Sequence, residues 1–202
     1  MVNADGSHPQ SEAAPGTDRD RRAELVNAAV DYVAAHGIAD LSLRGLGAAI
    51  GVSHRMLIHY FGSKEQLLVE IVRTSEQRQR DLLSRLRLEP GVLPADAARL
   101  LWQQLTDPRL ADQERLFFEI YAHALRGRPE AAPVLEGLVN DWLGPLEAAE
   151  VAVGADPATA RNRARLGLAT VRGLLLDLLA TGDRAGVDAA MEEFLRLYYG
   201  SK

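Results

Sequence analysis

The chain has 202 residues, of which 47 % are hydrophobic and 25 % charged, as in ordinary globular proteins of one sizeable domain or two small ones. It contains no cysteine, which excludes disulfides, thiolate nucleophiles and cysteine-ligated zinc. No apolar run approaches the ~20 residues that cross a bilayer, and the first residues lack the basic and apolar regions of a signal peptide. We therefore expect a cytoplasmic protein with no membrane partner.

The net charge of −5 counts against a nucleic-acid partner. Residues 18–81 are neutral, with nine basic and nine acidic side chains, and the excess of acidic residues lies on either side of them. A DNA-binding face depends on where cations gather locally, not on the charge of the whole chain. The composition therefore permits DNA binding, but the chain has no strongly basic segment of the kind that usually indicates it.

The first elements in chain order are a tail and two helices. Residues 1–17 are rich in Ala, Gly, Ser and Pro and predict a disordered tail. A helix is expected over 18–36, ended by Gly37, because its apolar residues recur at helical spacing: Leu25, Ala28, Ala29, Tyr32 and Val33. Ser42 is a good N-cap for a second, short helix with a buried stripe of Leu43, Leu46 and Ile50.

Two further helices follow closely. Ser53 can cap a third helix over 54–60, with Leu57 and Phe61 facing inward. Ser63 and Gln66 form a capping box that opens a long fourth helix. That helix is apolar at first and polar from Arg73 to Asp81, which predicts a solvated connector between two bodies.

The rest of the chain predicts five more helices, near 94–106, 109–126, 129–150, 157–181 and 183–199. Pro145 lies inside the third of these and should kink it. The fold class is thus all-α, with about nine helices and no strand pattern. We divide the chain into a tail over 1–17, a DNA-binding domain over 18–80 and a ligand-binding and dimerisation domain over 81–202.

Residues 41–68 carry the functional signal. They read as helix, glycine-containing turn, short helix, tight turn and capped helix, which is the layout of a helix-turn-helix. The short helix is expected to present His54, Arg55, Met56, Ile58, His59 and Tyr60 outward, and the major groove of DNA admits such a helix. Lys64 stands at the next helix N-terminus, where a phosphate could meet both its ammonium and free backbone amides.

This stretch resembles the TetR family of helix-turn-helix transcriptional regulators. The matching motifs are Ser42-x-Arg44-x-Leu46, Ala48-x-x-Gly51-Val52-Ser53, Leu57, Phe61 and Ser63-Lys64-Glu65-x-Leu67-Leu68, within roughly residues 19–79. The resemblance implies a two-domain all-α homodimer, a double-stranded DNA operator with one half-site per subunit, and a ligand pocket in the second domain. The sequence departs from the family at Arg55, where a small residue or Pro is usual, at Ile58, where Tyr is usual, and at Tyr60, often His.

From the motif we predict nine DNA-binding residues: Ser42, Arg44, Ser53, His54, Arg55, Met56, His59, Tyr60 and Lys64. The histidines, Arg44 and Lys64 could also be plain surface residues, but the outward face of this helix has no other role in the motif. Tyr60 has two open interpretations, since it either faces the duplex or packs under the turn.

A small-molecule effector is expected between the fourth helix and the helices at 94–150. The predicted ligand-binding residues are aromatic, with two polar groups: Trp102, Phe117, Tyr121, His123, Asn140 and Trp142. This lining predicts a largely apolar, near-neutral effector. Glu119 and His123 are spaced i, i+4, but no complete metal motif accompanies them, and a buried, hydrogen-bonded His123 is the favoured interpretation. We expect no metal, no cofactor and no catalytic residues.

The last two helices are expected to form a four-helix, two-fold dimer interface. Their apolar faces comprise Leu166, Ala169, Val171, Leu174, Leu175 and Leu178 on one and Val187, Met191, Phe194, Leu195 and Tyr198 on the other. The favoured function is a DNA-binding repressor that an effector releases from its operator. The alternative is an all-α enzyme or small-molecule-binding bundle without DNA function, for which no nucleophile–base set or phosphate loop is found.

Overall fold

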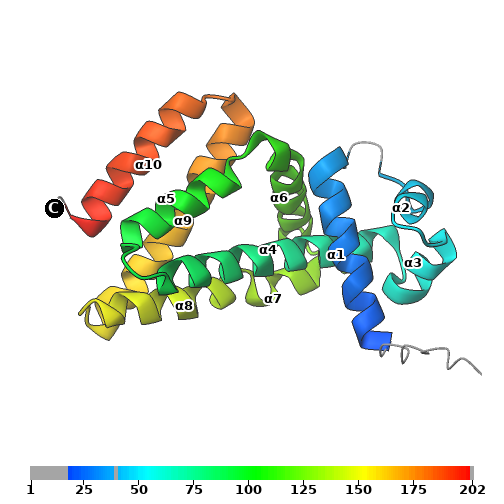
Figure 1. The fold of residues 1–202 in the computed structure, drawn as a ribbon, viewed down its shortest axis with the longest axis horizontal. Coiled ribbons are helices and arrows are strands. Elements are labelled where there is room, and N and C mark those ends of the chain that lie inside the picture. The colour runs from blue at the N-terminus through cyan, green and yellow to red at the C-terminus, as the bar shows by residue number, and fades with distance from the viewer. Residues whose placement is uncertain (1–17, 39–40, 201–202) are drawn as a thin grey trace, which may run out of the picture.

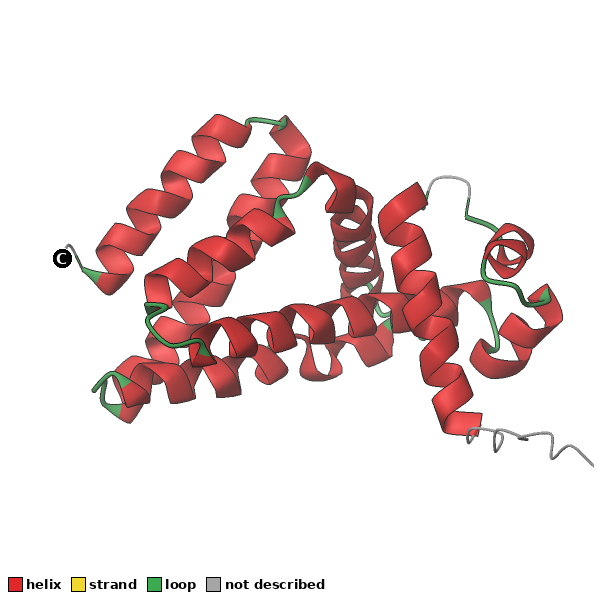
Figure 2. Cartoon of the chain, in the orientation of Figure 1, coloured by secondary structure: helices red, strands yellow, loops and turns green. Residues whose placement is uncertain are grey.

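The computed structural model describes residues 18–38 and 41–200, and all regular structure in these ranges is helical (Figures 1 and 2). The tail predicted over 1–17 lies outside the described residues. The helices are α1 Asp18–His36, α2 Leu43–Ala49, α3 His54–Phe61, α4 Lys64–Leu88, α5 Pro94–Leu105, α6 Ala111–Leu125, α7 Leu135–Leu138, α8 Asn140–Ala152, α9 Pro157–Thr181 and α10 Arg184–Tyr199. Two 3₁₀ turns, η1 Pro108–Leu110 and η2 Ala132–Val134, precede α6 and α7. The all-α prediction is confirmed.

The helix α4 connects the two ends of the molecule (Figure 1). Its first half carries α1, which crosses it, and the small helices α2 and α3 lie at that end. Its second half reaches the bundle of α5, α8, α9 and α10. None of the helices in the described ranges is long and apolar enough to span a bilayer.

One hydrophobic core unites the N-terminal helices with part of the second domain. Its buried residues come from α1 to α4, among them Leu46, Leu57 and Ile71, and from α6, among them Leu116 and Ile120. Two further clusters fill the other half, one between α4, α5, α8 and α9 and one between α5, α9 and α10. The core therefore crosses the predicted domain boundary at residue 80, with α4 and α6 both contributing to it.

Two predictions about local structure are wrong. The segment 129–150 is not one helix, because Glu136 and Gly137 have non-helical backbone and Gly137 has a φ of 83°. Consequently η2 and α7 are separated from α8, which continues through Pro145. The polar stretch 73–81 of α4 is not a solvated connector either, because Ser75 and Glu76 are buried against the second domain.

Candidate nucleic-acid interface and internal cavity

Three serines set the geometry of the helix-turn-helix. The side chains of Ser42, Ser53 and Ser63 cap α2, α3 and α4 by accepting hydrogen bonds from the backbone N–H three residues on, at 3.0, 3.2 and 3.1 Å. The hydroxyls thus satisfy amides that the helix starts leave without intrahelical partners. Ser42 and Ser53, both predicted DNA contacts, therefore have a structural role in this domain.

The turn between α2 and α3 depends on glycine at two positions. Gly51 has a φ of 75°, which favours a residue without Cβ. Gly47 is buried on α2, and a Cβ placed there would lie 2.7 Å from the backbone oxygen of Val52. The turn consequently packs directly on α2 and fixes the angle at which α3 leaves it.

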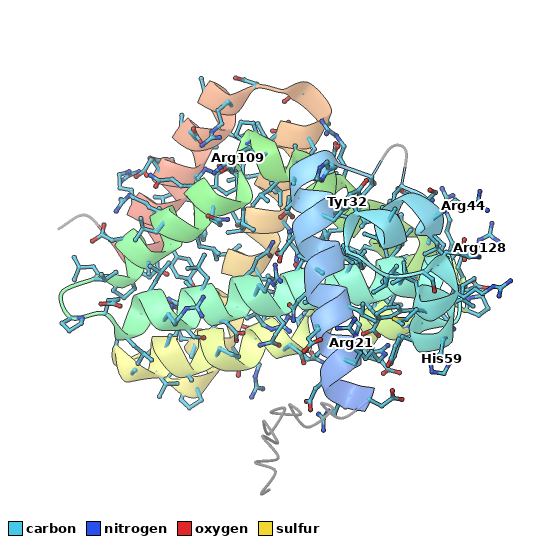
Figure 3. The ribbon with its side chains drawn as sticks, turned by 45° about the vertical axis from the view of Figure 1, so that its right-hand side comes forward. Arg21, Tyr32, Arg44, His59, Arg109 and Arg128 are labelled. Carbon is cyan, nitrogen blue, oxygen red and sulfur yellow. The ribbon has the colours of Figure 1, made fainter. Side chains whose placement is uncertain are left out.

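The helix α3 has one buried and one exposed face. Leu57 and Phe61 are buried in the core, whereas Arg55, Met56, Ile58 and His59 are exposed and His54 is half-buried. Figure 3 shows His59 and Arg44 at the outer end of this unit, pointing away from the rest of the protein. The predicted outward face is thus present, and it contains two large apolar side chains that stay exposed among the described residues, Met56 at 37 % and Ile58 at 45 %.

Unpaired cations surround this face. None of the ion pairs formed among residues 18–38 and 41–200 involves Arg44, Arg55 or Lys64. Arg44 and Arg55 are exposed, and Lys64 stands half-buried at the first position of α4. These three positive side chains lie next to helix N-termini, positions at which a negatively charged group is stabilised in general.

The structure places Tyr60 against α1. Its hydroxyl donates to the carboxylate of Asp18 at 2.9 Å, and its ring packs on the hydrophobic core. This corresponds to the second interpretation of Tyr60, in which the ring packs under the turn. The other predicted side chains of the helix, Arg55, Met56 and His59, do share the exposed face.

The sequence analysis missed Arg22, a residue of α1 that binds α3 and α4. Its guanidinium donates to the backbone oxygen of Tyr60 at 3.3 Å and to Glu70 at 3.0 Å, and it lies over the ring of Phe61 at 5.1 Å. A helical wheel could have placed Arg22 beside the apolar stripe of the first helix, but its partners lie 38 to 48 residues away.

The second domain encloses a cavity of about 80 Å³ between α4, α5, α6, α8, α9 and α10. Three of the predicted ligand-binding residues, Trp102, Phe117 and Trp142, line it. Tyr121, His123 and Asn140 do not, and His123 and Asn140 are exposed. The expectation of a buried His123 is wrong, because α6 turns that side chain and Glu119 to solvent. Pockets for small molecules usually measure about 300–1,000 Å³, so a ligand would have to widen this cavity.

Charged residues that the sequence analysis did not select lie beside the cavity. Glu76 on α4 accepts hydrogen bonds from the indole N–H of Trp142 at 2.8 Å and from Arg172 at 2.9 Å. Glu114 on α6 accepts one from Gln79 at 2.9 Å. Both carboxylates are at least nine-tenths buried. Burial raises the pKa of Glu76, which the charge of Arg172 opposes, and burial together with the charge of Glu76 raises the pKa of Glu114 to about 8.

The described residues contain no group of three or more His, Cys, Asp or Glu side chains that could hold a metal ion. The buried carboxylates instead belong to a network with Arg172, whose guanidinium also donates to the backbone oxygen of Leu138 at 2.8 Å. Arg172 is therefore engaged inside the subunit.

Comparison with known proteins agrees with this geometry. Residues 25–71 match the model of the bacterial regulatory proteins of the tetR family. The chain is 41 % identical over 54 residues to the HTH-type transcriptional regulator BetI of Agrobacterium fabrum, covering 27 % of this chain and 26 % of that protein. It is 28 % identical over 86 residues to BetI of Stenotrophomonas maltophilia, covering 43 % and 44 %. The matches thus span from a quarter to less than half the length of these curated relatives.

Solved structures extend the likeness over the whole fold. A transcriptional regulator from Rhodococcus sp. Rha1 superposes with a TM-score of 0.66 at 24 % identity, covering 88 % of this chain and 95 % of that one. The multidrug binding protein EbrR, complexed with imidazole, gives a TM-score of 0.58 at 28 % identity, covering 88 % and 94 %.

Fold and site together define a helix-turn-helix DNA-binding domain on an all-α body. The comparisons make the class of this domain more specific: over residues 25–71 it is similar to the bacterial regulatory proteins of the tetR family, and the curated relatives that match it are HTH-type transcriptional regulators.

Proposed function

We propose that this protein is a transcriptional repressor of the bacterial cytoplasm that binds a double-stranded DNA operator and leaves it when a small molecule enters the second domain. The observation that supports DNA binding is the exposed face of α3, flanked by the unpaired cations Arg44, Arg55 and Lys64. The major groove accepts an α-helix of this size, and phosphates on either side would neutralise the cations.

A homodimer accounts for exposed apolar surface on α9 and α10. Leu166 and Leu176 on α9 are 57 % and 50 % exposed, and with Ala169 and Gly173 they form one stripe at helical spacing. Leu197 on α10 is 68 % exposed. Several residues expected in the interface, including Leu175, Val187, Met191 and Leu195, are buried in the subunit's own core, so the interface we propose is the outer stripe alone.

The proposed coupling runs along α4 and α6. The helix α4 begins at Lys64 beside the DNA face and lines the cavity with Glu76, Gln79 and Leu83. At the start of α6, the side chain of Asp112 lies against Gly37 at the end of α1. A ligand that widens the cavity would tilt both helices and change the distance between the two α3 helices of a dimer, which should be about 34 Å. It releases DNA only if it binds the released conformation more tightly.

Selection of bound sites from a random DNA pool tests whether the protein binds a specific operator. We expect a palindromic consensus with half-sites one helical turn apart and an affinity that falls steeply with salt. Recovery of no consensus, or of binding without salt dependence, would refute the proposal.

A further inference from the structure

Large apolar side chains are exposed at a single place in the N-terminal part of the protein. Among the described residues from Asp18 to Arg87, Met56 and Ile58 are the only large hydrophobic residues that are exposed. The others are buried or half-buried, as Leu57 and Phe61 are on the opposite face of the same helix. A lone exposed apolar residue needs no explanation, but two on the outward face of one short helix indicate a surface that another molecule covers.

The helical spacing divides the exposed face of α3 into two pairs. Residues three apart are neighbours on a helix surface, whereas residues two apart do not face each other. Ile58 therefore lies beside Arg55, and Met56 lies beside His59, which Figure 3 shows at the outer end of the molecule. Each pair combines an apolar side chain with one that can donate hydrogen bonds.

Charge favours DNA over a protein as the molecule that covers this face. The cations Arg44, Arg55 and Lys64 stand around it, and none of them forms an ion pair with another described residue. The helix α3 itself contains no acidic residue. The major groove has phosphates along both edges, and the only apolar group that its bases present is the 5-methyl group of thymine. An apolar side chain between cations therefore fits a thymine.

Ile58 is better suited than Met56 to select a base. It is the more exposed of the two, at 45 % against 37 %. Its β-branched side chain is stiff about the first torsion angle, so it holds one position against a base. Methionine is unbranched and flexible and adapts to many surfaces, so Met56 can pack on DNA without preferring one base.

We propose that Ile58 determines operator specificity by packing against the 5-methyl group of a thymine beside the base pair that Arg55 contacts. This inference rests on the proposed function, because it concerns how the same helix recognises the operator. A rise of about 1.5 Å per residue places Ile58 about 4.5 Å further along α3 than Arg55, and successive base pairs are about 3.4 Å apart. The thymine should therefore lie one or two base pairs from the position that Arg55 specifies.

Deoxyuridine isolates the methyl group, because it pairs with adenine as thymidine does and differs only at carbon 5 of the base. Each thymine in one half-site of the selected operator is replaced in turn, and binding of the full-length protein is titrated. Arg55→Ala locates the base pair that Arg55 specifies. Since burying one methyl group changes affinity about fourfold, one replacement near that base pair should weaken binding about fourfold.

Two variants show which side chain the methyl group contacts. In Ile58→Ala the thymine and deoxyuridine operators should bind equally. The control Met56→Ala removes the other large exposed apolar side chain of α3 and should keep the full difference between the two operators. Both residues are exposed, so neither variant removes a core contact, and circular dichroism checks that both fold.

The inference is overturned if Arg55 specifies no base pair, or if no thymine lies within two base pairs of the one that it specifies. It is also overturned if the difference persists in Ile58→Ala or is lost in Met56→Ala. Equal binding of both operators by the unaltered protein would assign the exposed apolar side chains to a protein partner instead. In all these cases a specific operator is still bound and the proposed function stands. Recovery of no consensus refutes the proposed function, and the inference with it.

Discussion

At the scale of single residues, Arg55 and Lys64 should have different roles on DNA although neither forms an ion pair with another described residue. Arg55 is on the exposed face of α3, where it can reach a base edge, whereas Lys64 is at the N-terminus of α4, where a phosphate would sit. Arg55→Ala should cost about 1–3 kcal/mol of binding free energy at one base position. Lys64→Ala should weaken binding to all DNA sequences alike, and it should reduce by about one the slope of the logarithm of the binding constant against the logarithm of the salt concentration.

Binding titrations at several salt concentrations, on the selected operator and on single-base variants, measure both effects. The exposed Arg109, on η1 in the second domain, gives a matched control, and Arg109→Ala should leave the DNA affinity unchanged. A loss for Arg55→Ala that is uniform over all sequences would make Arg55 a phosphate contact.

Glu114 should also make stability depend on pH. The native state keeps its proton up to about pH 8, whereas an unfolded glutamate releases it near pH 4.5, so the free energy of unfolding falls as pH rises between these values. One proton accounts for a slope of at most ~1.4 kcal/mol per pH unit. Denaturant unfolding at pH 5 and pH 8 should show a smaller fall in Glu114→Gln than in the unaltered protein. Glu76 contributes to the slope in both, so an equal fall would contradict a raised pKa at Glu114.

At the scale of elements, the turn between α2 and α3 should be intolerant of a side chain at Gly47. A methyl group there would lie 2.7 Å from the backbone oxygen of Val52, which cannot move without shifting α3. We expect Gly47→Ala to destabilise the protein by about 1–3 kcal/mol and to abolish operator binding. Gly144 in α8 has no atom of another element near its Cβ position, so Gly144→Ala should change stability less than Gly47→Ala and leave operator binding intact. Thermal unfolding and DNA titration of both variants provide the test.

Local chemistry explains which elements could be predicted from the sequence. The starts of α2, α3 and α4 followed from Ser42, Ser53 and Ser63, because capping involves residues three apart. The break at Gly137 was missed because the positive φ of a lone glycine has no signature in its neighbours. The burial of Glu76 was missed because its partners, Trp142 and Arg172, are 66 and 96 residues away. The exposed face of α3 could also be predicted, because it follows from the spacing of apolar residues within one short helix. The buried charged residues beside the cavity could not be predicted, because their burial depends on partners far away in the sequence.

At the scale of the whole molecule, the proposed regulation requires two copies of the chain held at a fixed distance. The helix α10 lies at the end of the molecule opposite α3, and α9 packs beside it, so a dimer formed through these helices leaves both helix-turn-helix units free (Figure 1). A buried glutamate in that interface would lack a partner and would repel its symmetry mate across a two-fold axis. Leu176→Glu should therefore dissociate the dimer, and because each half-site alone binds weakly, operator affinity should fall at least tenfold.

Light scattering at micromolar concentration measures the mass directly, against 22.0 kDa for one chain. Leu125 at the end of α6 supplies the control, since it is 68 % exposed, more than the 50 % of Leu176, and lies outside α9 and α10. Leu125→Glu should leave a dimer of twice the chain mass with unchanged operator affinity. If Leu176→Glu also stayed dimeric, the outer stripe of α9 would not be the interface. A second contradictory outcome is an unaltered protein that is a monomer and still binds a palindromic site. A ligand could then not act by changing the distance between two α3 helices, and the proposed regulation would be refuted.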